Sequence, residues 1–308
     1  MRALVTGSSG FAGQWLLREL AAAGHEAIPD HPGGQRVEIT DRAAVGDLLR
    51  GTRPDLVIHL AAMAFGPDAE ADPTAAFRAN VGGTANLMDA LRRLEAPPAV
   101  VVVSSAEVYG QPERDVDLLD ETAPTVPMRS YGLSKLAQES VALALALRGS
   151  DGPRVAIVRP FNHTGPGQRR DFAIPAFASR IVEARSTGAA SIRVGNVDVR
   201  RDIGDVRDTV RAYRLVGERL VDGRIETGQR LNIATGVPVR IGTIIDALSA
   251  MAGHPVGLEV APDLVRGDDP PVIAGDASLL RRLTGWSPEI PLDQTLRDVL
   301  ADVERSAS

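Results

Sequence analysis

The chain alternates short runs of consecutive apolar residues with longer stretches in which apolar residues recur every three or four positions. Short apolar runs bounded by turn residues predict buried strands, and the longer stretches predict amphipathic helices. Strands that alternate with helices are typical of a parallel sheet with helices on both faces. The predicted strands cover 2–6, 26–28, 55–60, 99–104, 155–158 and 230–233, and the predicted helices cover 11–23, 42–50, 74–94, 131–147, 205–220, 240–251 and 295–304.

This alternation changes after 159–160, where loops lengthen and proline and glycine become more frequent. We therefore predict an α/β fold, with a Rossmann-like doubly wound parallel sheet and a smaller C-terminal α/β region that binds the substrate. One domain is assigned to residues 1–160 plus about 197–235, and a second domain to about 161–196 and 236–308.

Two helical patterns are more apolar than an exposed surface favours. They cover residues 84–93 and 136–147. Since a surface helix normally keeps its apolar residues on one stripe, we expect one or both patterns to pack against a second copy of the chain. The sequence thus predicts a homodimer.

Composition excludes several classes of protein. The 308 residues carry a formal net charge of -6, so no basic excess is available to neutralise the phosphates of nucleic acid or of a membrane surface. The sequence has no cysteine, which removes disulfides, thiolate metal sites and cysteine nucleophiles. Neither a signal peptide nor the roughly 20 consecutive apolar residues of a membrane span can be recognised. We expect a cytoplasmic protein that binds neither nucleic acid nor membrane.

Metal chemistry is not predicted. Histidines lie scattered at positions such as 59, 163 and 254, without the spacing of metal ligands. His163 is expected to have a structural role.

Glycines occupy the turn between the first predicted strand and the first predicted helix, in the spacing Gly-x-x-Gly-x-x-Gly. Glycine permits the unusual dihedrals of such a turn and lets the backbone approach a pyrophosphate closely. The helix start then offers free amides and the positive end of its dipole to the phosphates. The predicted dinucleotide-binding residues of this turn are Gly7, Ser9, Gly10, Phe11, Ala12 and Gly13.

An acidic residue about 20 positions beyond these glycines usually binds the adenosine ribose. Asp30 is the candidate for the 2′-hydroxyl, and the alternative is that it is only a turn residue between two prolines. No arginine follows it immediately, which favours NAD over NADP. Glu38 and Ile39 are candidates for bracketing the adenine.

Tyr131 and Lys135 form a Tyr-x-x-x-Lys pair at the start of a predicted helix. Because they lie four residues apart, they project from one helix face. A neighbouring ammonium favours the ionised phenol, so we predict that Lys135 lowers the pKa of Tyr131 and makes it a usable acid or base. Both residues are also assigned to the cofactor site, where Lys135 is expected to bond the nicotinamide ribose.

Ser105 follows the strand 99–104, at the carboxyl edge where ligands of such sheets bind. A serine hydroxyl and the Tyr131 phenol can together hold and protonate one carbonyl while hydride arrives from a nicotinamide. Ser104 is the alternative, because adjacent strand residues face opposite sides. These residues predict hydride chemistry on a carbonyl substrate.

The chain resembles, almost from end to end, the extended short-chain dehydrogenase/reductase family of nucleotide-sugar enzymes. The run Arg159-Pro-Phe-Asn-His-Thr-Gly-Pro-Gly-Gln168 is similar to the signature of GDP-mannose 4,6-dehydratases and GDP-4-keto-6-deoxymannose reductases. The runs 199–208, 269–276 and 283–291 are similar to the reductase branch.

The resemblance implies that the domain of residues 1–160 plus about 197–235 binds the dinucleotide and that the domain of about 161–196 and 236–308 binds the nucleotide sugar. It also implies further site residues by position. Asn80 would support the active-site lysine through its helix or a water, Phe161 would lie near the nicotinamide, and a cation suits the phosphates of the nucleotide. The residues implied are Leu60, Ala61, Ala62, Asn80 and Phe161 for the cofactor, and Asn162, Arg201 and Arg266 for the substrate.

The chain departs from the family pattern in three places. Residues 203–204 are Ile-Gly where the family has Phe-Thr, and Arg266 lacks the proline expected after it. The segment 29–35 is short and lacks the arginine that NADP-using relatives often carry. These departures bear on the nucleotide base and on the choice of cofactor.

The resemblance implies NAD(P)H-dependent reduction of the C4 keto group of a nucleotide-linked 4-keto-6-deoxy sugar, with GDP as the favoured nucleotide. Tyr131 would donate the proton and Ser105 would orient the carbonyl. A 4,6-dehydratase needs an additional acid and base. Glu107 occupies the position for one, but the reductases also carry a glutamate there. Ser rather than Thr at position 105 favours the reductase.

Two alternatives stay open beside the reductase and the dehydratase. An epimerase would use the same scaffold and return the hydride to its substrate. A non-catalytic dinucleotide-binding regulator would need only the glycine turn, so the Tyr131–Lys135 pair argues against it.

Overall fold

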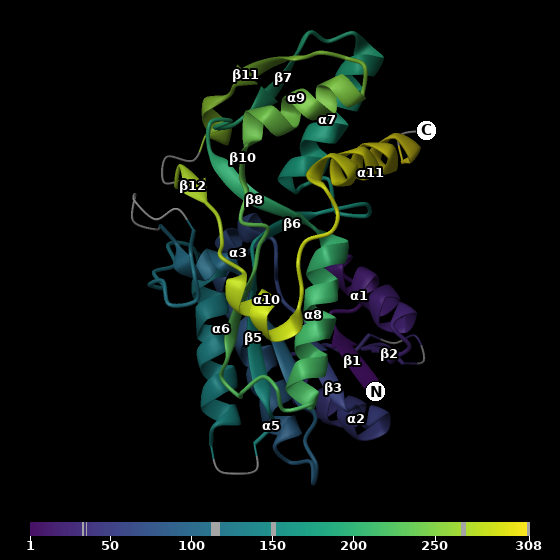
Figure 1. Cartoon of the computed structure of the whole chain (residues 1–308), viewed down its shortest axis with the longest axis vertical. Coiled ribbons are helices and arrows are strands. Elements are labelled where there is room, and N and C mark those ends of the chain that lie inside the picture. The colour runs from purple at the N-terminus through teal and green to yellow at the C-terminus, as the bar shows by residue number, and fades with distance from the viewer. Residues whose placement is uncertain (33, 35, 112–117, 149–151, 266–268, 307–308) are drawn as a thin grey trace.

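The computed structural model describes residues 1–32, 34, 36–111, 118–148, 152–265 and 269–306. Figure 1 shows a large parallel sheet with its helices in the lower part of the molecule and a smaller group of helices and strands above it. The large sheet has the order β2-β1-β3-β4-β5-β9, which confirms the predicted doubly wound α/β fold. Its strands are β1 (Arg2–Thr6), β2 (Glu26–Pro29), β3 (Leu56–His59), β4 (Ala99–Val103), β5 (Val155–Pro160) and β9 (Arg230–Ile233).

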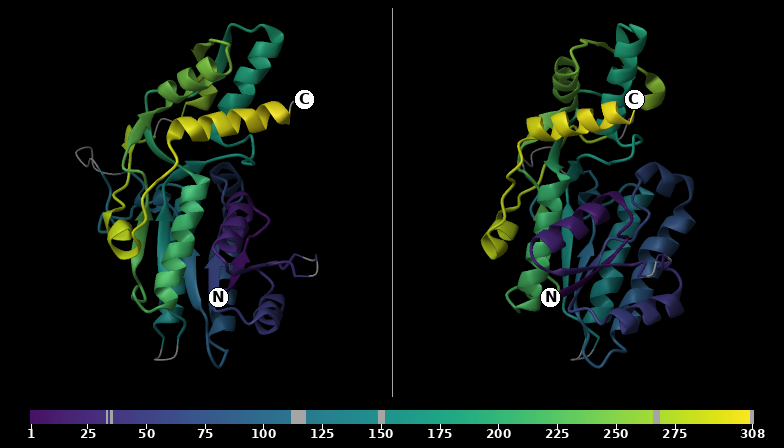
Figure 2. Two further views of the ribbon diagram at one scale, coloured as in Figure 1. Left: turned by 45° about the vertical axis from the view of Figure 1, so that its right-hand side comes forward. Right: turned by 90° about the vertical axis from the view of Figure 1, so that its right-hand side faces the viewer.

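Helices cover both faces of this sheet, as the right-hand view of Figure 2 shows. On one face, α1 and α8 pack together over a core that includes Val101 and Val103; on the other, α2, α5 and α6 pack over a core that includes Val100 and Val102. A strand buried on both faces reads as a continuous apolar run, which explains the valines of β4. These helices are α1 (Phe11–Ala22), α2 (Arg42–Thr52), α5 (Gly83–Leu91), α6 (Ser130–Ala146) and α8 (Val206–Val221).

The predicted helix over 74–94 forms over most of its length, but it contains a π-helical turn. The chain forms α3 (Gly66–Ala71) and α4 (Pro73–Phe77), then a π-helical turn, η1 (Arg78–Gly82), before α5 begins. In this wide turn Asn80 is fully buried and its amide bonds to the backbone N–H and C=O of Met63. Tertiary partners of this kind cannot be read from apolar spacing, and π turns are frequent at functional sites.

The upper part of the molecule has its own apolar core, formed by α7, α9 and α11 with the pair β7–β11. A second sheet has the order β10-β8-β12, and β6 also pairs with β8. The helices of this upper part are α7 (Ala173–Thr187), α9 (Ile241–Met251) and α11 (Leu292–Arg305). The short helix α10 (Ser278–Thr284) lies below them. The strands of the upper part are β6 (Asn162–Thr164), β7 (Ser191–Val194), β8 (Arg200–Asp205), β10 (Pro238–Arg240), β11 (Gly257–Val260) and β12 (Val272–Ile273). Its 3-10 turn is η3 (Pro262–Leu264).

The strand β8 pairs within the smaller sheet, whereas α8 and β9 return to the large one. The predicted segment 197–235 therefore contributes to both sheets, and the division into two domains remains a prediction. The homodimer was predicted from apolar helical patterns that include part of α6. Leu133 on that helix is 46% exposed, and the homodimer likewise remains a prediction.

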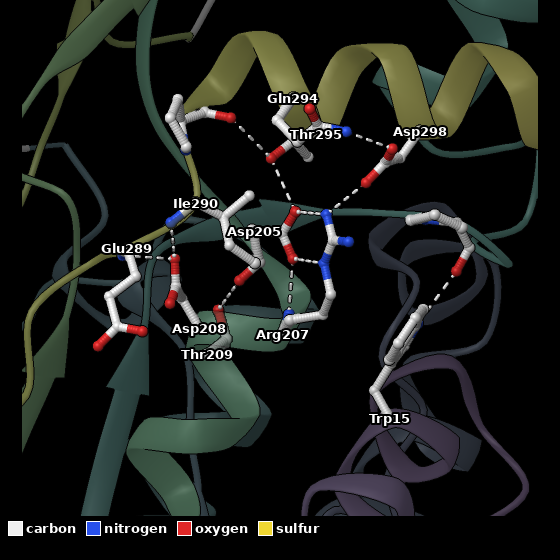
Figure 3. A network of polar contacts seen from close by, with 12 residues as sticks. Trp15, Asp205, Arg207, Asp208, Thr209, Glu289, Ile290, Gln294, Thr295 and Asp298 are labelled. Atoms are coloured by element: carbon white, nitrogen blue, oxygen red, sulfur yellow. Dashed lines mark hydrogen bonds and ion pairs between the residues drawn. The ribbon is translucent and has the colours of Figure 1, made fainter.

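Buried carboxylates fasten the C-terminal part of the chain to the start of α8 (Figure 3). Asp205 accepts hydrogen bonds from the backbone and guanidinium of Arg207 and, at 2.7 Å, from the Thr295 hydroxyl. Asp208 accepts the backbone N–H groups of Glu289 and Ile290, both at 2.9 Å. A carboxylate that accepts several backbone bonds fixes the chain around it. Much of the 199–208 run is therefore structural.

Among the described residues, no helix combines the length and apolar character needed to cross a lipid bilayer.

Candidate active site

The glycine turn lies at the switch point of the large sheet, between β1 and β3. Gly7 has φ +72°, and a β-carbon on it would lie 2.7 Å from the backbone nitrogen of Ala61. A β-carbon on Gly13 would lie 2.4 Å from the carbonyl oxygen of Gly7. Both positions require glycine, and ligands of such sheets bind at the carboxyl ends of strands beside the switch point. The predicted Leu60, Ala61 and Ala62 follow β3 directly at this edge.

The start of α1 fits a phosphate group. None of the described side chains caps this helix, whose N-cap residue is Gly10. The first amides of a helix otherwise lack intrahelical acceptors, and with the helix dipole they favour an anion. Phe11 and Ala12 supply amides of this first turn, and Ser9 precedes it. The turn can therefore hold the pyrophosphate of a dinucleotide.

We expect Gly13→Ala to abolish tight NAD(P)H binding and to destabilise the protein, because the added methyl group would overlap the Gly7 carbonyl. Gly51→Ala is the matched control: a β-carbon there meets nothing within 4 Å, so this change in α2 should be neutral or stabilise by up to about 1 kcal/mol. Fluorescence titration with the cofactor and thermal unfolding measure both effects. Wild-type cofactor affinity in Gly13→Ala would contradict the proposed close approach.

Asp30 braces this turn. One carboxylate oxygen accepts the backbone N–H of Gly7 at 2.6 Å, and the other accepts the Ser8 hydroxyl at 2.5 Å. The residue is only 3% exposed, so it is more than a solvated turn residue. Its contact with a ribose remains a prediction.

The two residues predicted to bracket the adenine differ in their surroundings. Ile39 packs so closely on α5 that a β-carbon on Gly83 would lie 2.6 Å from it. The Glu38 side chain is exposed and faces Arg36. Ile39 thus helps to shape the wall beside the turn, whereas Glu38 pairs with Arg36 at the exposed surface.

The structure distinguishes the two serines after β4. Ser104 is buried and donates a hydrogen bond to Glu139 at 2.6 Å. Ser105 accepts the backbone N–H of Glu107 at 3.1 Å, and its hydroxyl interacts with the Tyr131 phenol. Ser105 is therefore the serine that shares a site with the tyrosine, and Glu107 begins the 3-10 turn η2 (Ala106–Tyr109) beside it.

Tyr131 lies in the first turn of α6 and is 9% exposed. Burial raises the pKa of its phenol well above the ordinary value, and the negative charge of Glu107 adds to this, while the Ser105 hydrogen bond acts in the opposite direction. The surroundings thus produce a rise where we predicted a lowering, because burial outweighs the other effects. The phenol is protonated at neutral pH, which is the form that can donate a proton.

Lys135 is the only lysine in the sequence. It is 2% exposed, and its ammonium donates to the Val103 carbonyl at 2.8 Å and to the Gln138 side-chain oxygen at 2.9 Å. Burial lowers the pKa of Lys135 to about 7, although the charge of Glu139 opposes the change. The Nζ atom lies 5.9 Å from the centre of the Tyr131 ring. Lys135 is thus placed to balance the charge of a tyrosinate.

Asn80 reaches α6 from the π-helical turn. Its side-chain nitrogen donates to the Ser134 hydroxyl at 2.8 Å, and that hydroxyl donates to the Tyr131 carbonyl at 2.7 Å. Asn80 therefore supports the helix that carries Tyr131 and Lys135.

The remaining residues that the resemblance implies for the cofactor and the substrate come from the 159–168 run and from β8. Phe161 is 3% exposed and packs so closely that a β-carbon on Gly275 would lie 2.4 Å from its ring. Asn162 is exposed at the start of β6. Arg201 donates to the Pro270 carbonyl at 2.9 Å and lies mostly buried, so it is not a solvated surface charge. Arg266 lies outside the described residues.

The histidines take part in hydrogen bonds within the protein. His59 lies between two threonine hydroxyls, and His163 contacts the Phe161 carbonyl and stacks on Phe11. The part of the chain that the structure describes contains no group of three or more potential metal ligands.

Sequence analysis missed a buried ion pair behind the site. Arg159 donates to both oxygens of Glu139, at 2.9 and 2.8 Å, and to the Tyr109 hydroxyl at 3.1 Å. Burial alone would lower the pKa of Arg159, but hydrogen bonds and the charge of Glu139 raise it overall. Apolar neighbours on both sides of Arg159 were the available signal, since a charged residue inside a buried strand requires a partner.

Residues 3–234 match the NAD dependent epimerase/dehydratase family. The chain belongs to this family. Among its curated relatives, the GDP-6-deoxy-D-mannose reductase of Pseudomonas aeruginosa is 36% identical over 306 residues, which cover 98% of this chain and 97% of the relative. The GDP-6-deoxy-D-talose 4-dehydrogenase of Aggregatibacter actinomycetemcomitans is 31% identical over 288 residues, 92% of each chain.

Solved structures of epimerase/dehydratase proteins match over nearly the whole length. RMD from Pseudomonas aeruginosa complexed with NADPH has a TM-score of 0.88 and 33% identity, with 99% of this chain and 100% of that chain covered. MoeE5 in complex with UDP-glucuronic acid and NAD has a TM-score of 0.83 and 28% identity, with the same coverage. The chain therefore binds NAD(P)(H), as the sequence predicted, and the assignment of the dinucleotide to the glycine turn remains a prediction.

Proposed function

We propose that the protein is an NAD(P)H-dependent 4-ketoreductase that acts on a nucleotide-linked 4-keto-6-deoxy sugar, with GDP-4-keto-6-deoxy-D-mannose as the favoured substrate. The observation that carries this proposal is the shared site of Ser105 and Tyr131 at the sheet edge, with the only lysine beneath them. The GDP-linked 6-deoxy sugars in the names of two relatives support the choice of substrate.

Three residues have different roles in the reduction of the carbonyl. The bound reduced nicotinamide supplies a hydride for the carbonyl carbon. The Ser105 hydroxyl orients the carbonyl oxygen, and Tyr131 gives it a proton. The phenol becomes negatively charged as it does so, and the ammonium of Lys135 stabilises that charge. Since the pKa of Lys135 is about 7, kcat should fall as pH rises through neutrality and the ammonium is lost.

For the cofactor, we propose a preference for NADH over NADPH. No arginine stands in 31–35 to bind a 2′-phosphate, and a carboxylate at position 30 suits a ribose hydroxyl. RMD binds NADPH, so the preference is tested by measuring kcat/KM with each reduced cofactor. A higher kcat/KM with NADPH than with NADH would overturn the preference without affecting the reductase.

One assay separates the enzyme classes. The protein is mixed with GDP-4-keto-6-deoxy-D-mannose and either reduced cofactor, and both the cofactor absorbance and the sugar are followed. We expect one reduced cofactor to be consumed for each keto sugar reduced. Conversion of GDP-mannose to the keto sugar without net change in cofactor would identify a dehydratase instead. Tight cofactor binding without turnover of any nucleotide sugar would identify a regulator.

The second candidate is a 4,6-dehydratase or an epimerase. Glu107 is the observation that favours a dehydratase, because its charge acts on the Tyr131 phenol and it therefore lies near the site. A dehydratase must remove a proton at C5 and expel the C6 hydroxyl, which needs such an additional acid and base. Glu107→Gln separates the two: it should retain keto-sugar reduction but would abolish dehydration.

A further inference from the structure

A series of hydrogen-bonded polar side chains, here called the polar chain, extends from Lys135 to β1. It consists of Gln138 on α6, Thr84 on α5, His59 on β3 and Thr6 on β1, none of which takes part in the proposed reaction. Gln138, Thr84 and His59 are 0% exposed and Thr6 is 2% exposed. Buried polar groups destabilise a protein unless their hydrogen bonds are made. The bonding of this chain is therefore strictly determined.

Successive members of the chain lie within hydrogen-bonding distance. The Gln138 side-chain nitrogen lies 3.0 Å from the Thr84 hydroxyl, and that hydroxyl lies 2.8 Å from Nε2 of His59. Nδ1 of His59 lies 2.7 Å from the Thr6 hydroxyl. The chain thus connects the lysine helix to the strand that leads into the glycine turn.

Thr84 fixes the direction of these bonds. Its hydroxyl has one proton, which it donates to the Asn80 carbonyl at 2.6 Å. It must therefore accept from both Gln138 and His59. The amide nitrogen of Gln138 then faces Thr84, and the amide oxygen is left facing Lys135, which resolves the usual ambiguity of an amide side chain.

His59 completes the same pattern. Burial lowers its pKa to about 3, with the charge of Lys135 acting in the same direction, so the ring is neutral and has one N–H. That N–H is on Nε2, since Thr84 must accept there. Nδ1 accepts the proton of Thr6, whose oxygen in turn accepts the Ala61 N–H at 3.3 Å. Each of the four side chains thus donates to at least one acceptor.

We propose that Gln138 is a positioning residue for Lys135, and that Thr84 orients its amide so that the oxygen receives the ammonium. This inference rests on the proposed function, in which Lys135 stabilises the tyrosinate. An ammonium has three N–H groups. The Val103 carbonyl and Gln138 take two of them, which leaves the third for the phenol or for the ribose of the cofactor.

The charged and titratable groups around Lys135 do not compete with the bond from its ammonium to the Gln138 side-chain oxygen. Glu139 follows Gln138 on α6, but Arg159 on β5 pairs with both of its oxygens. His59 on β3 is neutral. The charge of Glu107 on η2 acts on Tyr131. Gln138 therefore contacts the ammonium directly as a neutral acceptor, and its replacement can either weaken or strengthen the stabilisation of the ammonium.

The single lysine allows a direct test. Protein labelled with [6-13C]lysine, expressed with a lysine-free tag, contains one labelled site, so its NMR signal needs no assignment. The chemical shift of the labelled carbon follows the protonation of the amine in the protein without cofactor. In the wild-type protein we expect a titration midpoint near 7.

Two variants at position 138 should move this midpoint in opposite directions. Gln138→Met keeps the size of the side chain and removes the acceptor, so the midpoint should fall by about one pH unit, the size of a lost hydrogen bond to a charged group. Gln138→Glu keeps an oxygen beside the ammonium and adds a negative charge, so the midpoint should rise. General loosening of the core would shift both variants toward the ordinary value of a solvated lysine.

Two further variants complete the series. Thr84→Val removes the hydroxyl that orients the amide and should lower the midpoint by less than Gln138→Met does. Ser140→Ala, on the exposed side of the same helix, should leave it unchanged. With the keto sugar, the alkaline limb of the kcat profile should move in the same direction as each midpoint.

Equal midpoints in the wild type, Gln138→Met and Gln138→Glu would overturn the role of Gln138. The NMR titration needs no substrate, so this outcome is independent of the enzyme's activity. Conversely, shifted midpoints in a protein that reduces no nucleotide sugar would show that the proposed function had failed while the contact held. If Gln138→Met does not fold, Gln138→Glu and Thr84→Val still decide, because their predicted shifts have opposite signs.

Discussion

Tyr131→Phe is expected to lower kcat for the keto sugar by about 10²–10⁴-fold, the usual contribution of a positioned general acid. The change removes only the phenolic O–H and leaves the ring to fill the same buried space at the start of α6. Because no contact with the cofactor phosphates is altered, the affinity for NAD(P)H should remain close to that of the wild type. Steady-state kinetics and a cofactor titration on the same preparation measure the two effects.

Tyr213→Phe is the matched control for this prediction. Tyr213 is a buried tyrosine on α8, 1% exposed, and the substitution removes the same hydroxyl group. We expect it to retain most of the wild-type kcat. Wild-type turnover in Tyr131→Phe, or an equal loss in the two variants, would contradict the assignment of Tyr131 as proton donor.

Glu139→Gln is expected to reduce the free energy of unfolding by about 3–5 kcal/mol, the usual cost of breaking a buried ion pair by removing one charge. The side chains of Glu139 and Arg159 are 1% and 3% exposed, so water cannot replace the lost carboxylate. Glutamine has one acceptor oxygen in place of two, so either the bond from Ser104 or the bond from the Arg159 Nη2 would lose its acceptor. Urea denaturation followed by two independent probes measures the change and tests whether unfolding remains two-state.

Asp47→Asn provides the comparison for this stability measurement. Asp47 pairs with Arg50 on the surface of α2, where the two side chains are 75% and 65% exposed. Exposed pairs of this kind contribute about 0–1 kcal/mol. A loss of less than about 1 kcal/mol in Glu139→Gln would mean that the pair behind the site is no more important than one on the surface.

The large sheet could be predicted because its signals are local. The valines of 100–103 alternate between two covered faces, so the strand is apolar at every position and remains recognisable without tertiary information. The glycine turn could be predicted for a related reason. The close approaches of Gly7 and Gly13 leave room for no other residue type, and the requirement is therefore visible in the sequence.

The small elements of the upper region could not be predicted in the same way. Strands such as β6 and β12 are two or three residues long, too short for a period of two to emerge. The carboxylates of Asp205 and Asp208 show a further limit. In the sequence they are part of the 199–208 run that resembles the reductase branch, but in the structure they bind the chain near α11.

The site was predicted in its residue types more completely than in its electrostatics. The alternation of a strand separates Ser104 from Ser105, but only the position of Glu139 determines which of them faces the tyrosine. The direction of the Tyr131 pKa shift depends on burial and on Glu107, and both depend on the tertiary structure. Gln138 lies three residues from Lys135 and shares its helix face, yet its role depends on Thr84 across the helix interface.

The reductase is tested most directly by following the hydrogen itself. The enzyme is given GDP-4-keto-6-deoxy-D-mannose and reduced cofactor that carries deuterium at nicotinamide C4 on the transferring face, and the product sugar is examined by NMR. The account predicts deuterium at C4 of the sugar, with one cofactor oxidised for each sugar formed. A product without deuterium at C4, or one formed with no net oxidation of cofactor, would contradict it.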